Sequence, residues 1–234
     1  MRGQDLPPRC SSVGAVTETE IVRDVRAAYD TAAEDYRTLV RGGIKLGTVY
    51  HALLVDFAER VVAGGGGPVA DVGCGPGVVT GMLADLGLDV RGVDLSPRMI
   101  ELARRDHPNL RFDVGPMAAL SYGDGELAGV LAWWSIIHTP PEEQPALFRE
   151  LHRVLAPGGH VLTGFHAGDE YVHSSHAYGH DVSLHAWLLS PDEVARAATS
   201  AGFDVLLRLT TAPEGRQKNP QASLLFRKPP GGPG

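Results

Sequence analysis

The chain has 234 residues and a formal net charge of −7 at pH 7. This length suits one α/β domain with a sizeable core, and no apolar run reaches the ~18 residues expected of a membrane span. An acidic balance disfavours a nucleic-acid partner, because phosphate contacts need clustered Lys and Arg. The two cysteines are too few for a disulfide framework or a cysteine-based metal site. We expect a soluble, cytoplasmic protein that binds no nucleic acid, membrane or metal.

The N-terminal part is predicted to hold a short leader and two helices. Residues 1–17 are polar and broken by two prolines, so we expect a disordered leader. A helical pattern of apolar residues begins at Glu18 and continues through Tyr29 and Tyr36. A second helix is predicted over 48–63, and four glycines followed by a proline end it.

The stretch that follows is the most informative in the chain. Residues 69–72 are predicted to form a short buried strand, after which Gly73, Gly75 and Gly77 turn the chain into a helix. Glycines at this spacing allow a tight bend and a close approach of a ligand to main-chain N–H groups. A second strand over 89–93 ends in Asp94, where a carboxylate can bind both hydroxyls of a ribose.

The charge of this stretch indicates which nucleoside cofactor it suits. A dinucleotide-binding G-x-G-x-x-G motif would need glycine at position 78, which is Val78, and there is no P-loop motif. Asp71, just before the turn, would repel a pyrophosphate but would suit a cation. S-adenosylmethionine (SAM) carries a sulfonium and an ammonium group and no phosphate, so it fits this pattern best.

The rest of the chain continues the alternation of strands and helices. Ser96 and Pro97 are predicted to open a helix, and Ser190 and Pro191 another. Further strands are predicted over 110–114, 127–134, 160–165, 203–210 and 222–228. The pattern predicts an α/β, Rossmann-like three-layer sandwich with a seven-stranded, mostly parallel sheet and an antiparallel edge strand. We expect a single domain over 18–228, with lid segments at about 18–63 and 166–190 and a disordered tail over 229–234.

Five histidines fall within the predicted 166–190 segment. An exposed polar loop is the favoured interpretation, and a lid over the substrate is the second. A metal site is the third, because His176 and His180 have H-x-x-x-H spacing, although Gly179 lies between them.

Three motifs resemble the class I SAM-dependent methyltransferases, in particular the small single-domain bacterial enzymes that act on small molecules. They are DVGCGPG at 71–77, GVDLSPRM at 92–99 and LHRVLAPGG at 151–159. The resemblance implies methyl transfer from SAM to O, N or C of a small metabolite, for example in secondary metabolism, with S-adenosylhomocysteine as product. Together with the charge argument, the resemblance implies that ten residues bind the cofactor. They are Tyr29, Tyr36, Asp71, Gly73, Gly75, Asp94, Leu95, Met99, Met117 and Trp133.

One position departs from the family pattern. An acidic residue often follows the glycine after the third strand and binds the adenine amino group, but here that residue is Pro116. Adenine recognition is therefore expected to use backbone near Met117. Of the two tryptophans that end the fourth strand, Trp133 and Trp134, one is expected to line the crevice.

A hydroxyl or ammonium acceptor needs a base, and histidine suits that task. His138, after the fourth strand, is the first candidate, and His166, after the fifth, is the second. Each could instead be a structural residue, and many methyltransferases need no base. The alternatives to an enzyme of this kind are a non-catalytic SAM-binding protein and, less favoured, a nucleotide-dependent oxidoreductase. The expected partner is a small-molecule acceptor, and the expected assembly is a monomer or homodimer.

Overall fold

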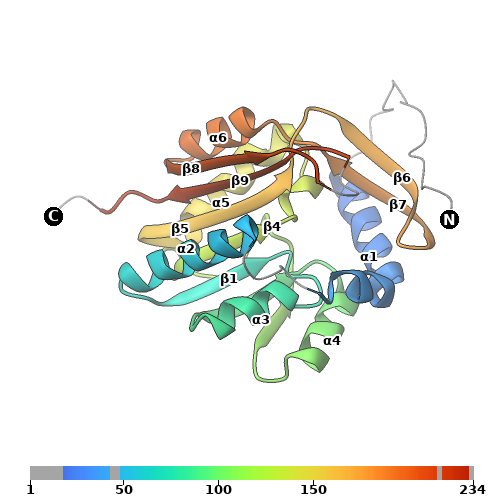
Figure 1. Cartoon of the computed structure of the whole chain (residues 1–234), viewed down its shortest axis with the longest axis horizontal. Coiled ribbons are helices and arrows are strands. Elements are labelled where there is room, and N and C mark those ends of the chain that lie inside the picture. The colour runs from blue at the N-terminus through green and yellow to red at the C-terminus, as the bar shows by residue number, and fades with distance from the viewer. Residues whose placement is uncertain (1–17, 43–47, 215–217, 232–234) are drawn as a thin grey trace.

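The computed structural model describes residues 18–42, 48–214 and 218–231. The predicted leader, 1–17, lies outside the described residues. Seven strands form one sheet in the order β3-β2-β1-β4-β5-β9-β8 (Figure 1). Their bounds are β1 Pro68–Val72, β2 Asp89–Asp94, β3 Arg111–Val114, β4 Leu127–Trp133, β5 Leu155–His166, β8 Asp204–Thr211 and β9 Gln221–Arg227.

Strands β1 to β5 pair in parallel, as the alternating elements predict. The last two strands form the antiparallel pair at the edge of the sheet. Strand β9 runs antiparallel to both β5 and β8, so it lies one position inside the edge and β8 is the outermost strand. The predicted fold class is confirmed, and the order of these two strands refines it.

Helices cover both faces of the sheet because its buried strands are apolar on both sides. One face packs against α5 (Gln144–Val154) and α6 (Pro191–Ser200), and the other packs against α2 (Val49–Ala63) and α3 (Val78–Asp85). Successive residues of β1 divide between the two cores, with Ala70 in the first and Val69 in the second. Helix α4 (Pro97–Asp106) packs beside β3, and two 3-10 turns, η1 (Ile136–His138) and η2 (Pro141–Glu143), follow β4.

The predicted serine caps of two helices are confirmed, and a third helix has a threonine cap. Thr48, Ser96 and Ser190 each accept a hydrogen bond from the backbone N–H three residues later. Thr48 caps α2, and the serines, each followed by proline at the first helical position, cap α4 and α6. The Ser96 cap fixes where the chain leaves β2 and enters α4.

The polar-loop interpretation of the histidine-rich segment is wrong, because the segment folds into a β-hairpin. Strand β6 (Tyr171–Ala177) pairs with β7 (His180–Trp187) in a separate two-stranded sheet. The two-residue turn, Tyr178 and Gly179, has positive φ at both positions, 55° and 88°. Such turns match the twist of paired strands but usually hold Asn or Gly. A tyrosine is held there by contacts with α1.

Helix α1 (Glu18–Val40) and this hairpin cross the same end of the main sheet (Figure 1). We call α1 with β6 and β7 the lid. Its own small core consists of Ile21, Val25 and Ala28 from α1 and Leu184 from β7. Ser183 of the hairpin donates to Asp24 of α1, at 3.0 Å.

Ion pairs fasten the other side of α1 to α4. Arg37 binds both carboxylate oxygens of Asp106, and Glu34 lies within ion-pair distance of Arg98 and Arg105. Because these groups are partly exposed, each pair contributes little on its own. Together they fix the position of α1 over the ends of the strands.

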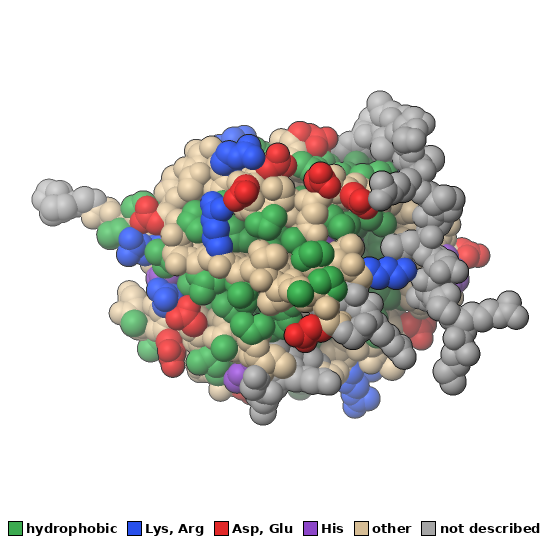
Figure 2. All heavy atoms as spheres, turned by 45° about the horizontal axis from the view of Figure 1, so that its top comes forward, with side chains coloured by type: hydrophobic (Ala, Val, Ile, Leu, Met, Phe, Trp, Pro, Cys, Tyr) green, Lys and Arg blue, Asp and Glu red, His purple; other side chains and the backbone are tan. Residues whose placement is uncertain are grey.

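Within the described part of the chain, no helix is long and apolar enough to cross a bilayer. On the face shown in Figure 2, acidic and basic side chains are interspersed with apolar ones.

Candidate functional site

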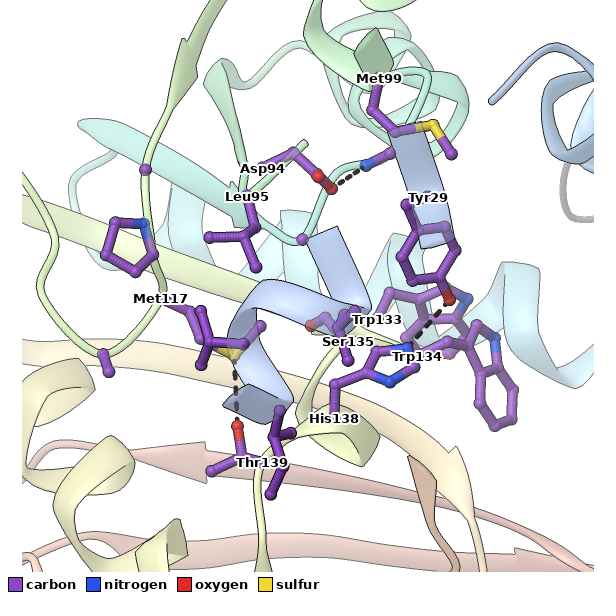
Figure 3. Close-up of a pocket in the computed structure, with 18 of the residues that line it drawn as sticks. Tyr29, Asp94, Leu95, Met99, Met117, Trp133, Trp134, Ser135, His138 and Thr139 are labelled. Carbon is purple, nitrogen blue, oxygen red and sulfur yellow. Dashed lines mark hydrogen bonds between the residues drawn. The ribbon is translucent and has the colours of Figure 1, made fainter. Parts of the chain in front are cut away.

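A cavity opens beyond the carboxyl ends of the parallel strands, where open α/β sheets bind their ligands. It is lined by the loops after β1, β2, β3 and β4 and is closed from the side by α1 (Figure 3). Nine of the ten residues expected to bind the cofactor line this cavity, and the tenth, Asp71, lies in an adjoining one. The nine are Tyr29, Tyr36, Gly73, Gly75, Asp94, Leu95, Met99, Met117 and Trp133.

The glycine turn needs its glycines for two different reasons. A Cβ on Gly73 would lie 2.2 Å from the Cβ of Ser135, so this position has no room for a side chain. A Cβ on Gly75 would have as its nearest neighbour a ring carbon of Tyr36, 3.6 Å away, which is an ordinary contact distance. Gly75 lines the cavity. Both residues have positive φ. Gly73 thus allows tight packing, whereas Gly75 allows a ligand to approach the backbone.

Asp94 ends β2 and binds the glycine turn directly. One carboxylate oxygen accepts from the N–H of Gly75 and the other from the N–H of Ser96, each at 2.8 Å. Burial raises the pKa of Asp94, while these two bonds act in the opposite direction. Asp94 lines the cavity, and each carboxylate oxygen has more than one acceptor position, so the carboxylate could accept from two neighbouring hydroxyls of a ligand.

Asp71 is almost fully buried, with 1% of its surface exposed. It accepts from the hydroxyl of Thr80 at 2.6 Å, and burial raises its pKa to about 7. It lines a second cavity that shares Tyr36, the glycine turn and both tryptophans with the first. A buried carboxylate without a cation partner is costly. A positively charged ligand group in the second cavity would therefore be stabilised by Asp71.

One side of the cavity is apolar. Leu95, Met99 and Met117 line it together with Pro116 (Figure 3). Met99 is also part of a buried cluster between α1 and α4. The side chain of Met117 is held by a weak hydrogen bond from the Thr139 hydroxyl to its sulfur, at 3.8 Å. Proline at position 116 has no N–H or side-chain acceptor for adenine, so backbone near Met117 remains the expected contact.

His138 lies at the centre of the site, and its contacts fix its tautomer. Its Nδ1 is 2.6 Å from the carbonyl oxygen of His185, which can only accept, so Nδ1 carries the proton. In the neutral ring Nε2 is then an acceptor, and the hydroxyl of Tyr29 donates to it at 2.9 Å. Burial lowers the pKa of His138 to about 4. The imidazole is therefore neutral at physiological pH, and its Nε2 accepts the hydrogen bond from Tyr29.

The second base candidate, His166, is not among the described residues that line either cavity. Its Nδ1 is 3.0 Å from the side-chain amide of Gln221, and its ring packs against Trp134, with 5.0 Å between centroids. Trp134 itself lines both cavities, as does Trp133. Trp134 has a φ of 57°, which is rare for a bulky residue and is typical of functional sites.

Three tyrosines close the site from the side of the lid. Tyr178, at the turn of the hairpin, contacts the rings of Tyr29 and Tyr36, with centroids 6.1 and 5.0 Å apart. Tyr29 and Tyr36 also contact each other edge to face, at 5.4 Å. Because His185 and Tyr178 both belong to the hairpin, this segment supports the base candidate as well as the tyrosines.

Sequence reasoning missed Ser135 and Tyr178. Ser135 is 5% exposed and lines the cavity, and its hydroxyl has no hydrogen-bond partner within the described part of the chain. A buried hydroxyl is normally bonded, so this one fits a ligand. Ser135 directly follows the two tryptophans at the end of β4, and this position could have indicated that it lines the cavity. No sequence signal distinguished Tyr178 from an ordinary loop residue.

The histidines of the hairpin do not assemble a metal site in the described chain, where no group of three metal-binding side chains occurs. His176 pairs with Asp181 across the hairpin at 3.0 Å, and His180 pairs with Asp35 of α1 at 2.7 Å. The two histidines with H-x-x-x-H spacing thus bind different carboxylates.

Comparisons with known proteins agree with this geometry. Residues 69–159 match the family model of a methyltransferase domain. The methyltransferase GfsG of Streptomyces halstedii is 34% identical over 158 residues, which is 59% of this chain and 56% of that protein. The chain thus matches only somewhat more than half of that relative's length.

Solved structures share the fold at low sequence identity. The 1,6-didemethyltoxoflavin-N1-methyltransferase of Burkholderia thailandensis, solved with its substrate and S-adenosylhomocysteine, has a TM-score of 0.69 and 19% identity, covering 93% of both chains. The cyclase SpnF has a TM-score of 0.68 and 19% identity, covering 90% of this chain and 97% of that one. Residues 69–159 thus match a methyltransferase domain, and the chain shares the fold of structures solved as SAM-dependent methyltransferases.

Proposed function

We propose that the protein transfers a methyl group from SAM to O, N or C of a small-molecule acceptor. The observation that carries this proposal is the convergence of Asp94, the glycine turn and the neutral His138 on one cavity. Bound SAM would supply an electrophilic methyl group on a sulfonium that is already a good leaving group. The protein then needs to supply orientation, exclusion of water and, for some acceptors, a base.

The residues around the cavity fit each part of SAM. Asp94 would accept from the two ribose hydroxyls, and Leu95 with Met117 would cover the adenine. The methionine end would extend past Gly75 and Tyr36 toward the second cavity, where Asp71 would face its ammonium group. The unpartnered hydroxyl of Ser135 supports a polar ligand group at this end.

We propose His138 as the base, because it lines the cavity, its tautomer is fixed, and its Nε2 accepts a hydrogen bond from the Tyr29 hydroxyl that an acceptor group could replace. His166 is the weaker candidate, since its ring is bonded to Gln221 outside the lining of the cavity. With Nδ1 protonated and bonded, His138 can take a proton only at Nε2. An acceptor that needs no base would use the same cavity with His138 as a positioning group.

A small-molecule acceptor is supported by structurally similar proteins such as the 1,6-didemethyltoxoflavin-N1-methyltransferase. The fold alone does not decide the reaction, because SpnF, a cyclase by its description, has a similar fold. A protein that binds SAM without transferring its methyl group is therefore the alternative to test. The cytoplasmic location, the absence of a nucleic-acid partner and a monomeric or dimeric state remain predictions.

Titration calorimetry with S-adenosylhomocysteine, SAM and NAD tests the proposal directly. We expect binding of both adenosyl ligands and none of NAD. If well-folded protein bound NAD and neither adenosyl ligand, the oxidoreductase alternative would replace the methyltransferase. Release of S-adenosylhomocysteine upon addition of an acceptor panel then separates an enzyme from a non-catalytic SAM-binding protein.

A further inference from the structure

The turn that carries His138 is short and is closed by two backbone hydrogen bonds. The N–H of His138 donates to the carbonyl oxygen of Ser135 at 3.3 Å, and the N–H of Thr139 donates to that of Ile136 at 3.0 Å. Hydrogen bonds in a 3-10 turn have poorer geometry than those in an α-helix, so two of them hold the turn weakly. Nevertheless, Ser135, His138 and Thr139 all line the cavity. Their positions therefore depend on what else holds the turn.

A side chain from α5 closes the same turn a second time. Gln144 is the first residue of α5, and its Nε2 donates to the carbonyl oxygens of Ile136, at 2.9 Å, and Thr139, at 3.0 Å. These two carbonyls lie on either side of His138 along the chain. Because α5 is packed into the main core, the amide ties the turn to a rigid element of the fold.

The amide of Gln144 is not explained by packing. Both carbonyl oxygens can only accept, so the group that faces them is the NH₂ and not the amide oxygen. Its Oε1 then lies in the interior, with no hydrogen-bond partner within the described part of the chain. Gln144 is 3% exposed, and an unpaired buried acceptor is costly. A methionine would fill a similar space without that cost, so the two hydrogen bonds are what the amide adds here.

The ring of His138 is held from the opposite side by the lid. Its Nδ1 donates to the carbonyl oxygen of His185 in the hairpin, and the hydroxyl of Tyr29 in α1 donates to its Nε2 (Figure 3). The first of these bonds is 2.6 Å long, and hydrogen bonds weaken steeply as their angle departs from linearity. A small displacement of the turn would therefore weaken the contact that fixes the tautomer of His138.

We propose that Gln144 is a positioning residue, whose amide holds η1 where the proton of His138 stays on Nδ1 and Nε2 remains the base. This inference rests on the proposed function for the role of His138, and it needs no contact between Gln144 and a ligand. Without the amide, the bond to the His185 carbonyl is weakened and the proton distributes between the two ring nitrogens. Part of the protein would then present an N–H where the methyl acceptor needs a group that can take its proton.

Gln144→Met removes both donors at nearly constant length, and ¹⁵N spectra of histidine-labelled protein report the tautomer of His138. At neutral pH these spectra report the tautomer alone, because burial lowers the pKa of His138 to about 4. Wild-type protein should show one protonated and one unprotonated ring nitrogen for His138, assigned by their absence from the His138→Ala spectrum. In Gln144→Met the two signals should move toward each other.

Thr163→Val is the matched control, because it also removes a buried hydrogen bond from a side chain to the backbone. Thr163 is 0% exposed and donates to the carbonyl oxygen of Leu224 at 3.3 Å, and it is not among the described residues that line either cavity. Its His138 signals should match those of wild type. If folded Gln144→Met protein also kept the wild-type signals, Gln144 would stabilise the fold without positioning His138, and the inference would be overturned.

Two further measurements complete the test. If Gln144→Met does not fold, exchange in wild-type protein decides: both NH₂ protons of Gln144 should exchange at least about tenfold more slowly than those of free glutamine, and equal rates would refute the bonds. Calorimetry with S-adenosylhomocysteine keeps the proposed function separate. Wild-type protein that failed to bind this ligand would contradict the proposed function, whereas unchanged spectra in protein that binds it would contradict the role of Gln144 alone.

Discussion

Asp94→Asn is the sharpest test of the cofactor site, because it keeps the shape of the side chain and removes only charge and one acceptor. Asp94 accepts from the N–H groups of Gly75 and Ser96, both at 2.8 Å. Asparagine can accept from one of them, but its NH₂ group would then face the other donor. If Asp94 binds the ribose, as proposed, the variant also loses one charge-assisted bond to it and weakens the other. At about 1.5–3 kcal/mol for a hydrogen bond to a charged group, we expect a loss of about 2–4 kcal/mol in cofactor binding, or roughly 30- to 1000-fold in Kd.

The assay is titration calorimetry of S-adenosylhomocysteine at fixed salt, with a thermal melt of the ligand-free protein alongside. Asp113→Asn is the matched control, because Asp113 is an exposed carboxylate on the adjacent strand β3 and the change in net charge is the same. Its affinity should stay within about twofold of wild type. If folded Asp94→Asn protein bound as tightly as this control, the proposed contact between Asp94 and the ribose would be refuted.

Three further predictions follow from the geometry. Burial raises the pKa of Asp71 to about 7, and a bound ammonium group would lower this pKa. Binding of S-adenosylhomocysteine should therefore release a proton from Asp71, and it should become tighter as the pH rises from about 6 to 8. Asp71→Asn should remove this dependence, and an unchanged pH profile would refute the contact. The Cβ of Gly73→Ala would lie 2.2 Å from that of Ser135, so this variant should lose about 3–5 kcal/mol of unfolding free energy in a denaturant melt. Gly87→Ala, also at positive φ but in open space, should lose about 1–2 kcal/mol. Equal losses would contradict the steric argument. Asp106→Asn should speed amide exchange in α1 by up to about fivefold, and unchanged exchange would show that the ion pair does not hold the helix.

The convergence of the residues assigned to the cofactor on adjoining cavities could be predicted because its signals are local. The strand before Gly73, the turn and the strand that ends in Asp94 lie within one short stretch of sequence. Each residue there has a chemical role that its neighbours make visible: glycine where φ is positive, and a carboxylate where a strand ends. The parallel order of the strands then follows from the alternation of elements.

The hairpin could not be predicted in the same way, because its strands are stabilised by contacts far along the chain. Its strands are polar, and its turn is Tyr178 and Gly179 rather than Asn-Gly. Strand β5 also differs from its local sequence signal. Gly158 and Gly159 indicate a turn, but both lie within the strand. There the Gly158 N–H donates to the carbonyl of Lys228, whose N–H donates to Gly159, so pairing with the C-terminal strand overrides the local signal.

The surroundings of the two base candidates also depend on distant contacts. The Tyr29–His138 bond joins residues 109 positions apart, and no periodicity indicates it. The orientation of His166 depends on the residue at which β5 ends, because successive side chains of a strand point to opposite faces. Element boundaries are the least certain part of a prediction from one sequence, so the two base candidates could not be separated before the structure was known.

The two halves of the lid, α1 and the hairpin, lie far apart in the sequence, and this separation affects the order of folding. Asp24 and Ser183, which join these halves, are 159 residues apart, so during synthesis α1 emerges long before the hairpin it packs against. The lid core, only four buried side chains, requires closure of a very long loop and is expected to form after the main sheet. Contacts that form late affect the rate of unfolding more than the rate of folding. Substitutions in Leu184 or Val25 should therefore shorten the lifetime of the closed site while leaving the refolding rate of the sheet nearly unchanged.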